Sequence, residues 1–201
     1  MLDARIRPLI DPPLNAMGRR IAQSGISADA VTITGFLLGM AAAAAIAIGR
    51  MDAALWLFLA GRLADGLDGA VARASVKTDR GGYLDIVLDF ILYGAIPLAF
   101  AILDPARNAL PAAVLLMSFF ANGTTFLAYA IMAERRKLET TAQGVKSLYY
   151  VSGLAEGFET VVALAAFCIW PQHFPAIAYT YAALCFLSAS GRIMIAWRVL
   201  K

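Results

Sequence analysis

Four aspartates stand at helical spacing in the first half of the chain, within the stretch DGLDGAVARASVKTDRGGYLDIVLD. Asp65 and Asp68 are three residues apart and Asp85 and Asp89 are four apart, so each pair lies on one face of a helix. The flanking sequence is strongly apolar. A carboxylate at bilayer depth costs about 2.5 kcal/mol or more unless it meets a cavity, a partner or a metal. Four such side chains therefore indicate a functional site.

The chemistry that suits these aspartates is metal binding. Converging carboxylates repel one another unless a cation lies between them. Their ligands are oxygens, with no histidine or cysteine nearby, so we expect a hard ion, Mg²⁺ or Mn²⁺, with two ions held by the four acids. Because Mg²⁺ completes its shell with water and substrate phosphates, the expected substrate is a phosphoanhydride. Snorkelling to the membrane interface, or a polar cap at a helix end, would explain one such aspartate. Four together favour the metal site.

Small residues and an arginine accompany the acids. Gly66, Gly69, Ala70 and Ala72 would keep the wall beside the carboxylates low enough for a bulky anion. Arg73 follows directly, and a guanidinium can contact a phosphate through two hydrogen bonds. The sequence therefore predicts pyrophosphate binding beside the metal site.

The helices that must position these residues are expected to span a membrane. The 201 residues are 61% hydrophobic and 15% charged, whereas a soluble domain has about 25% charged residues. We predict an all-α membrane protein with one domain over residues 1–201, folded as a bundle of six transmembrane helices. The stretches long enough to span are 30–49, 53–72, 82–103, 109–133, 148–170 and 174–197.

Counting along the second and third stretches places the four acids at similar depth. If one runs inward from the outer face and the next returns to it, Asp65 and Asp68 are 12 and 15 residues from that face, counted from position 53. Asp89 and Asp85 are 14 and 18 residues from it, counted from position 103. At 1.5 Å per residue, the four share a band about 9 Å deep.

Basic residues identify the expected cytoplasmic side. They gather in the termini and in the loops after the second and fourth stretches, and only Arg50 and Arg107 lie opposite. We therefore expect a multi-pass protein of the cytoplasmic (inner) cell membrane, with both termini and the aspartates facing the cytoplasm. Membrane lipids account for the net charge of +3, so no nucleic-acid partner is expected.

An amphipathic helix is expected before the bundle. Apolar residues recur at helical spacing over residues 1–25 with arginines between them, which is typical of a helix lying on the membrane surface. Pro8, Pro12 and Pro13 must kink or break this juxtamembrane helix.

The aspartates and their neighbours resemble the signature of the CDP-alcohol phosphatidyltransferases, D-x-x-D-G-x-x-A-R followed by G-x-x-x-D-x-x-x-D. The six-span layout is also similar, so the resemblance covers essentially the whole chain. Seven residues separate the two halves of the signature, about one fewer than is usual in the family. The matching positions are Asp65, Asp68, Gly69, Ala72, Arg73, Gly81, Asp85 and Asp89.

The resemblance implies a role in phospholipid biosynthesis. A phosphatidyl group would pass from CDP-diacylglycerol, or a similar CDP-alcohol, to an acceptor hydroxyl, with release of CMP. All four aspartates would bind the two metal ions, and Asp89 would also deprotonate the acceptor. A homodimer is implied as well.

The resemblance also implies a CDP pocket. Gly69, Ala72 and Arg73 would line it. Thr32 matches a family position near the nucleotide, although Ala28 and Asp29 stand where the family often has Pro-Asn.

The motifs leave the acceptor open between a small alcohol and a phosphorylated alcohol such as glycerol 3-phosphate or inositol phosphate. Basic residues near the cytoplasmic entrance of the site suit a phosphate, but the preference of lysine and arginine for the cytoplasmic side of a membrane explains them equally well. Two glutamates in membrane-facing sequence would contact the acceptor, although pairing with Arg62 or Arg192 is their simpler interpretation. The candidates are Arg135, Arg136, Lys146, Glu156 and Glu159.

Two other classes of protein compete with an enzyme. A transporter also places acids at depth, but it predicts broken helices or related halves, and the sequence indicates neither. A family member without activity would be a nonenzymatic membrane partner, and the intact set of four aspartates argues against this.

Overall fold

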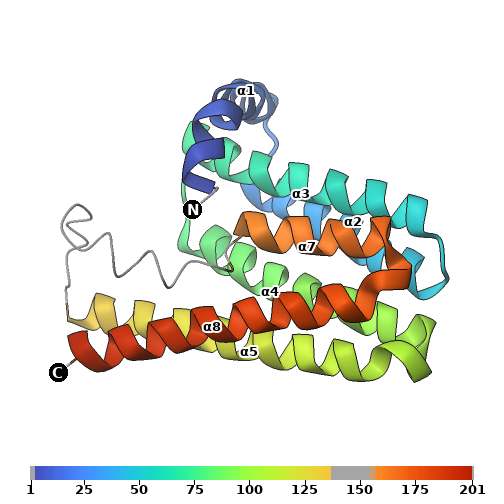
Figure 1. Cartoon of the computed structure of the whole chain (residues 1–201). Coiled ribbons are helices and arrows are strands. Elements are labelled where there is room, and N and C mark those ends of the chain that lie inside the picture. Colours follow the sequence, from blue (N-terminus) through green and yellow to red (C-terminus); the bar gives the residue numbers. More distant parts are fainter. Residues whose placement is uncertain (1–2, 137–154, 156, 201) are drawn as a thin grey trace.

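The computed structural model of the chain describes residues 3–136, 155 and 157–200, and this part is helical throughout with no strand (Figure 1). A single short 3₁₀ helix interrupts the series of α-helices. In chain order the elements are α1 (Asp3–Gln23), α2 (Ala28–Ala47), α3 (Met51–Ala74), α4 (Asp79–Leu103), α5 (Pro105–Arg135), α7 (Gly157–Ile169), η1 (Pro171–His173) and α8 (Phe174–Val199).

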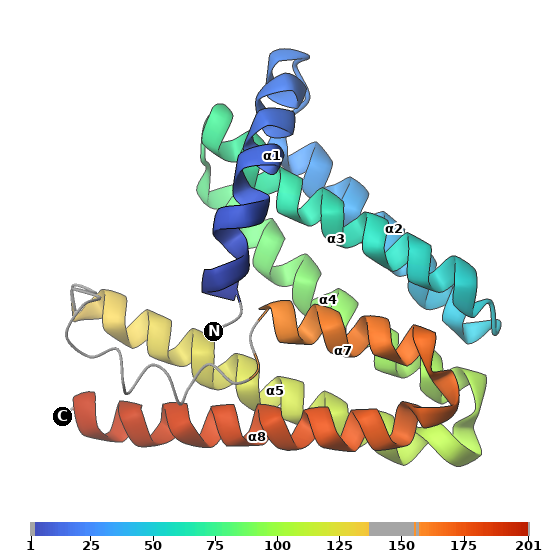
Figure 2. The same ribbon diagram turned by 45° about the horizontal axis from the view of Figure 1, so that its top comes forward.

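The helices pack in layers. α2 and α3 lie side by side, α4 and α7 follow, and α5 and α8 form the far layer, where they run in the same direction (Figures 1 and 2). α1 crosses the outer side of α3 near the end of α3 (Figure 2). The second half of α3 and the first half of α4, which carry the four aspartates, therefore meet at one end of the bundle.

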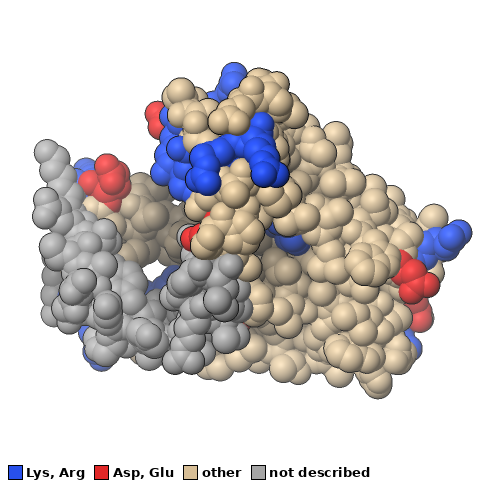
Figure 3. Space-filling view, turned by 90° about the horizontal axis from the view of Figure 1, so that it is seen from above, with Lys and Arg blue, Asp and Glu red and all other residues tan. Residues whose placement is uncertain are grey.

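The protein is a multi-pass membrane protein. Four of the described segments are long and apolar enough to cross a membrane: α2, α4, α5, and η1 with α8. Figure 3 shows Lys and Arg gathered around α1 and further charges at the opposite end of the bundle, with a largely uncharged surface between them. Such a band is typical of a surface that faces lipid.

Polar caps explain where the central helices begin. The side chain of Ser27 accepts a hydrogen bond from the backbone N–H of Ala30, and this caps α2. Thr78 caps α4 in the same way by accepting from the N–H of Gly81. Caps of this kind satisfy donors that the first turn of a helix leaves unpaired. The gap between the two halves of the signature is short, but α4 still begins after it with a regular cap.

Most of the expected spans coincide with observed helices. α2, α3, α4, α5 and α8 each overlap one predicted stretch. Residues 148–154 and 156 of the fifth stretch lie outside the described residues, and its remainder contains α7. Of the kink or break expected at the three prolines, a break does not occur, because α1 continues from Asp3 to Gln23 through all three. Pro12 and Pro13 are exposed, so water or headgroups can satisfy the carbonyls that lose an N–H partner.

A glycine contact sets the distance between α2 and α3. A Cβ atom on Gly35 would lie 3.0 Å from the carbonyl oxygen of Gly61, and one on Gly61 would lie 2.9 Å from the carbonyl oxygen of Gly35. The backbones therefore touch, as small residues allow in membrane helices. This contact brings the start of α2 close to the aspartates of α3.

Candidate functional site

Three of the four aspartates meet where α3 and α4 come together. One carboxylate oxygen from each of Asp65, Asp68 and Asp85 lies within 4.8 Å of the other two. Asp68 is buried, Asp65 is half-buried and Asp85 is exposed. We call these three residues the carboxylate cluster. Its oxygens are hard ligands of the kind that divalent cations bind.

A buried threonine fixes one member of the carboxylate cluster. The hydroxyl of Thr32 in α2 donates a hydrogen bond to Oδ2 of Asp68 over 2.6 Å. Both residues are only 7% exposed, so water does not compete for this bond. Thr32 was predicted as a nucleotide contact, and the structure adds that it orients a cluster carboxylate.

Asp89 lies beside the cluster but is bound by other groups. Its Oδ1 accepts a hydrogen bond of 2.7 Å from Nη1 of Arg62, and its Oδ2 accepts one of 3.1 Å from the hydroxyl of Tyr93. The same Nη1 atom is 3.5 Å from Oδ2 of Asp65. The guanidinium of Arg62 thus bridges Asp89 and the carboxylate cluster.

A cavity of about 310 Å³ lies between α2, α3 and the start of α4. We call it the α2–α4 cavity. It holds Asp68 and Asp85 from the carboxylate cluster, and Lys77 and Arg73 supply positive charge. All four residues predicted for the CDP pocket line it: Thr32, Gly69, Ala72 and Arg73.

The small residues on α3 divide between two faces. Gly69 and Ala72 line the α2–α4 cavity as predicted. Ala70 instead packs under α1, where a Cβ atom on Gly18 would lie 2.7 Å from it. Gly66 faces Leu14 of α1. The expectation that all four small residues form the anion wall was therefore wrong for these two, because their azimuth points them to the N-terminal helix.

Arg73 is itself held by α1. Its Nε and Nη2 atoms donate hydrogen bonds of 3.2 and 2.9 Å to Oδ1 of Asn15. The amide orients a guanidinium that the sequence assigns to phosphate binding. α1 thus contributes to one wall of the site.

A larger cavity, of about 650 Å³, lies on the other side of α4. We call it the α4–α8 cavity. Phenylalanines from α4 and α5 make much of its lining, and Asn122, Thr160 and Arg192 are polar residues in it. Asp85 and Asp89 also line it, so Asp85 belongs to both cavities.

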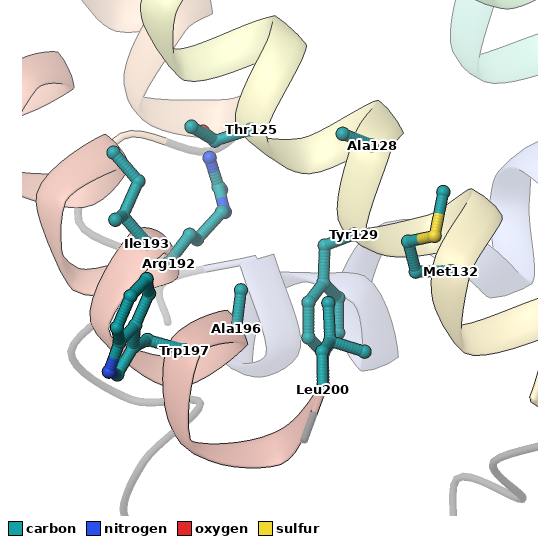
Figure 4. A pocket seen from close by; sticks show the side chains of 9 residues that line it. All are labelled: Thr125, Ala128, Tyr129, Met132, Arg192, Ile193, Ala196, Trp197 and Leu200. Atoms are coloured by element: carbon teal, nitrogen blue, oxygen red, sulfur yellow. The ribbon is translucent and has the colours of Figure 1, made fainter.

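A groove between the C-terminal halves of α5 and α8, which shares Arg192 with the α4–α8 cavity, has a volume of about 600 Å³ (Figure 4). Arg192 extends in it from α8 toward Thr125 on α5, and its Nη1 donates a 3.2 Å hydrogen bond to the carbonyl oxygen of Asn122. The other residues shown, such as Tyr129 and Trp197, are mostly apolar. No aspartate is among the described residues that line this groove.

The acceptor candidates are spread over the chain. Arg135 and Arg136 end α5, and neither lines the α2–α4 or the α4–α8 cavity. Lys146 and Glu156 lie outside the described residues. Glu159 lies on α7 next to Thr160, and its Oε2 is buried with no hydrogen-bond partner in the described part of the chain. Their roles stay predictions.

Sequence reasoning missed three residues that organise the site. It considered Arg62 only as a partner for glutamates, and it passed over Tyr93 and Asn15. Tyr93 stands one helical turn after Asp89 and Arg62 stands three residues before Asp65, so each shares a helical face with an aspartate. That spacing was the available signal. Asn15 gave none, because its contact depends on how α1 crosses α3.

Comparison with known proteins gives consistent matches. The family described as CDP-alcohol phosphatidyltransferase matches residues 26–200. The "Inner membrane protein YnjF" of Escherichia coli is 39% identical over 201 residues, which cover 100% of this chain and 98% of the relative. An archaetidylinositol phosphate synthase of Methanothermobacter thermautotrophicus is 28% identical over 207 residues, covering 98% of this chain and 95% of the relative.

A solved structure shares the fold. It is the crystal structure of a Mycobacterium tuberculosis phosphatidylinositol phosphate synthase with CDP-DAG bound. The TM-score is 0.62 at 21% sequence identity, and the match covers 92% of this chain and 93% of that one.

Proposed function

The chain belongs to the CDP-alcohol phosphatidyltransferase family, and we propose that it transfers a phosphatidyl group from CDP-diacylglycerol to a phosphorylated alcohol. Family membership makes it a phosphotransferase of phospholipid biosynthesis in a membrane. The observation that carries the proposal is the carboxylate cluster at the junction of two cavities. One cavity suits the CDP part of the donor, and the other suits lipid and acceptor.

The residues of the carboxylate cluster fit a divalent cation. Their oxygens lie within 4.8 Å of one another, close to the roughly 4 Å that separates opposite ligands of an octahedral Mg²⁺. Asp65, Asp68 and Asp85 would hold the ion. When bound, it neutralises the pyrophosphate and stabilises the CMP leaving group. The family is generally dependent on divalent metals; Mg²⁺ or Mn²⁺, and two ions per site, stay predictions.

Protein side chains would fill the remaining roles in the reaction. Arg73 binds a phosphate of the donor, and Gly69 and Ala72 let the nucleotide approach α3 closely. Asp89 accepts the proton of the acceptor hydroxyl. The acceptor oxygen forms a bond to the phosphatidyl phosphorus, the bond from that phosphorus to the bridging oxygen breaks, and CMP leaves with the electron pair.

A phosphorylated acceptor is supported by two observations. Arg192 lines the α4–α8 cavity together with Asp89, so a positive charge faces the space beside the proposed base. One reported relative, the archaetidylinositol phosphate synthase, and the structural neighbour are named for inositol phosphate products. Inositol phosphate is therefore the first acceptor to test, followed by glycerol 3-phosphate.

Six transmembrane helices would complete the membrane domain, which we take as a single domain over residues 1–201. α3 has 24 residues, about 36 Å of helix, which is enough to cross the hydrocarbon core. Its charged residues distinguish it from the four apolar segments described above. α7 has 13 described residues and would be the C-terminal part of the fifth span. α1 would lie amphipathically at the cytoplasmic surface, both termini would be cytoplasmic, and the family resemblance supports a homodimer.

The test is release of CMP from CDP-diacylglycerol by the purified protein in lipid nanodiscs. We expect release that requires Mg²⁺ or Mn²⁺, stops on addition of EDTA, and is fastest with inositol phosphate or glycerol 3-phosphate. Serine and phosphatidylglycerol complete the panel. Asp89→Asn should slow release by about 10²- to 10⁴-fold, the range for loss of a general base. If no acceptor supports CMP release, the proposed function is wrong; if serine is the best acceptor, only the acceptor class is wrong.

A further inference from the structure

Asn122 is a polar residue in the central part of α5, and it lines the α4–α8 cavity. α5 is one of the helices long and apolar enough to cross a membrane. A polar side chain within such a helix usually joins helices together or serves function. Both the oxygen and the nitrogen of this amide have partners. Those partners indicate which of the two roles applies.

The oxygens of Asn122 hold Arg192 of α8. Nη1 of Arg192 donates hydrogen bonds to Oδ1 of Asn122 and, over 3.2 Å, to the carbonyl oxygen of the same residue. The ring centre of Phe126, one helical turn further along α5, lies 5.5 Å from the guanidinium carbon. Such contacts offset the entropy lost when a long side chain is held in one orientation. We call Asn122 and Phe126 the arginine clamp.

The nitrogen of Asn122 sets the orientation of the amide. Nδ2 donates a 3.3 Å hydrogen bond to the carbonyl oxygen of Ala155. The backbone N–H of Ala155 in turn donates over 3.1 Å to Oγ of Ser188 on α8. An amide turned over would place its NH₂ group against the guanidinium, donor against donor. The bond to Ala155 therefore directs the amide oxygen toward Arg192.

The arginine clamp and Arg192 all line the α4–α8 cavity, together with Asp89. A guanidinium recognises a phosphate best when its plane is held, because two parallel hydrogen bonds need a defined direction. The clamp stands on α5, whereas the carboxylate cluster stands on α3 and α4. A change in the clamp should therefore affect the acceptor side of the site and spare the donor side.

We propose that Asn122 and Phe126 are positioning residues that set the specificity for a phosphorylated acceptor by holding Arg192 in the α4–α8 cavity. This inference rests on the proposed function, in which Arg192 faces the space for the acceptor phosphate. Asn122 and Phe126 contact the arginine, and the arginine contacts the ligand. Loss of the clamp weakens binding of the acceptor, while the reaction of bound substrates continues.

Steady-state CMP release in nanodiscs tests the arginine clamp. Asn122→Leu should raise KM for inositol phosphate by about 10-fold, because it removes a hydrogen bond to a charged group. Its kcat and its KM for CDP-diacylglycerol should stay within about 2-fold of the parent. Phe126→Leu should raise KM for inositol phosphate by about 2- to 5-fold, as expected for a lost cation–π contact. Glycerol 3-phosphate replaces inositol phosphate if it is the faster acceptor.

Thr124→Val is the matched control. Thr124 is exposed on the same helix, and its hydroxyl donates to the carbonyl oxygens of Phe120 and Ala121 within α5. This variant should match the parent. Inorganic phosphate isolates the phosphate contact, because it should compete with the acceptor. Its inhibition constant should rise in Asn122→Leu by the same factor as KM for the acceptor.

A double-mutant cycle distinguishes positioning from helix packing. Arg192→Met should raise KM for the acceptor at least as much as Asn122→Leu. The double variant should be no worse than Arg192→Met alone, because a residue that acts through the arginine has no effect once the arginine is gone. Losses that multiply in the double variant would overturn the proposal, and so would a parent KM in Asn122→Leu.

Thermal unfolding shows whether each variant is folded. If Asn122→Leu does not fold, Phe126→Leu still tests the clamp, and a parent KM for the acceptor in that variant would overturn it. If the parent releases CMP with a phosphorylated acceptor but Arg192→Met leaves its KM unchanged, this inference alone fails. If serine is the best acceptor, the acceptor class and this inference fail together. If no acceptor supports CMP release, the proposed function itself fails.

Discussion

Thr32 acts on the site through another residue. Its hydroxyl lies 2.6 Å from Asp68, and both side chains are buried between α2 and α3. Asp68 is proposed as a metal ligand, and a group that orients such a ligand usually affects metal affinity without touching the metal. Thr32 therefore contributes to the site twice, as part of the cavity lining and as the partner of a carboxylate.

Thr32→Val should raise the Mg²⁺ concentration needed for half-maximal CMP release by about 10- to 100-fold. Valine keeps the shape of the side chain and loses only the hydroxyl. Thr34→Val is the control, since Thr34 is exposed on the same helix and its hydroxyl donates only to the carbonyl oxygen of Ala30. A Thr32→Val protein with the Mg²⁺ requirement of the parent would show that Asp68 needs no such partner.

At the scale of single residues, local spacing predicted the acids but not their partners. Asp65 with Asp68, and Asp85 with Asp89, follow from helical periodicity alone. The bond between Arg62 and Asp89 joins residues 27 positions apart on different helices. Its existence depends on how α3 and α4 rotate against each other, which periodicity within one helix does not determine.

Among the elements, α1 has the most direct influence on the donor side. Gly18 touches Ala70, two residues after Asp68, and Asn15 holds Arg73. Moving α1 would therefore move the arginine that is proposed to bind phosphate.

Gly18→Ala should lower stability by about 1–3 kcal/mol and raise KM for CDP-diacylglycerol, because the new methyl group would lie 2.7 Å from the backbone of Ala70. Thermal unfolding in detergent and CMP-release kinetics measure the two effects. Gly66→Ala lies in the same interface, but its Cβ would lie 3.5 Å from Leu14 Cδ1, an ordinary contact, so it should behave as the parent. Identical behaviour of the two variants would show that the contact between α1 and α3 is loose.

Helix positions were largely predictable because turn and cap residues mark them. Ser27 and Thr78 begin α2 and α4 as capping residues do, and the apolar length fixes the rest. The continuity of α1 was not predictable from its prolines alone. A proline removes one hydrogen bond, and the cost depends on whether solvent reaches the freed carbonyl. The faces of Gly66 and Ala70 were likewise set by where α1 docks.

For the whole molecule, the charge distribution predicts the orientation in the membrane. The basic residues near α1 would face the cytoplasm, while Arg50 and Arg107 would face the other side. Cys168 and Cys185 are buried, so they should not react with added reagents.

Single cysteines should report this orientation in intact cells treated with a membrane-impermeant maleimide. We expect labelling of Arg50→Cys and protection of Ser24→Cys, because in the predicted orientation α3 would begin at the outer face and α1 would end at the inner one. After lysis, both should react. Labelling of Ser24→Cys before lysis would reverse the assigned orientation.

Asp85 lines both cavities, and α4 separates them. In the proposed reaction, the leaving nucleotide and the incoming alcohol would therefore lie on different sides of one helix. A single displacement would then join the two cavities, and no protein nucleophile would have to carry the phosphatidyl group. A single displacement inverts the configuration at phosphorus. A donor with a chiral phosphatidyl phosphorus would therefore give a product of inverted configuration.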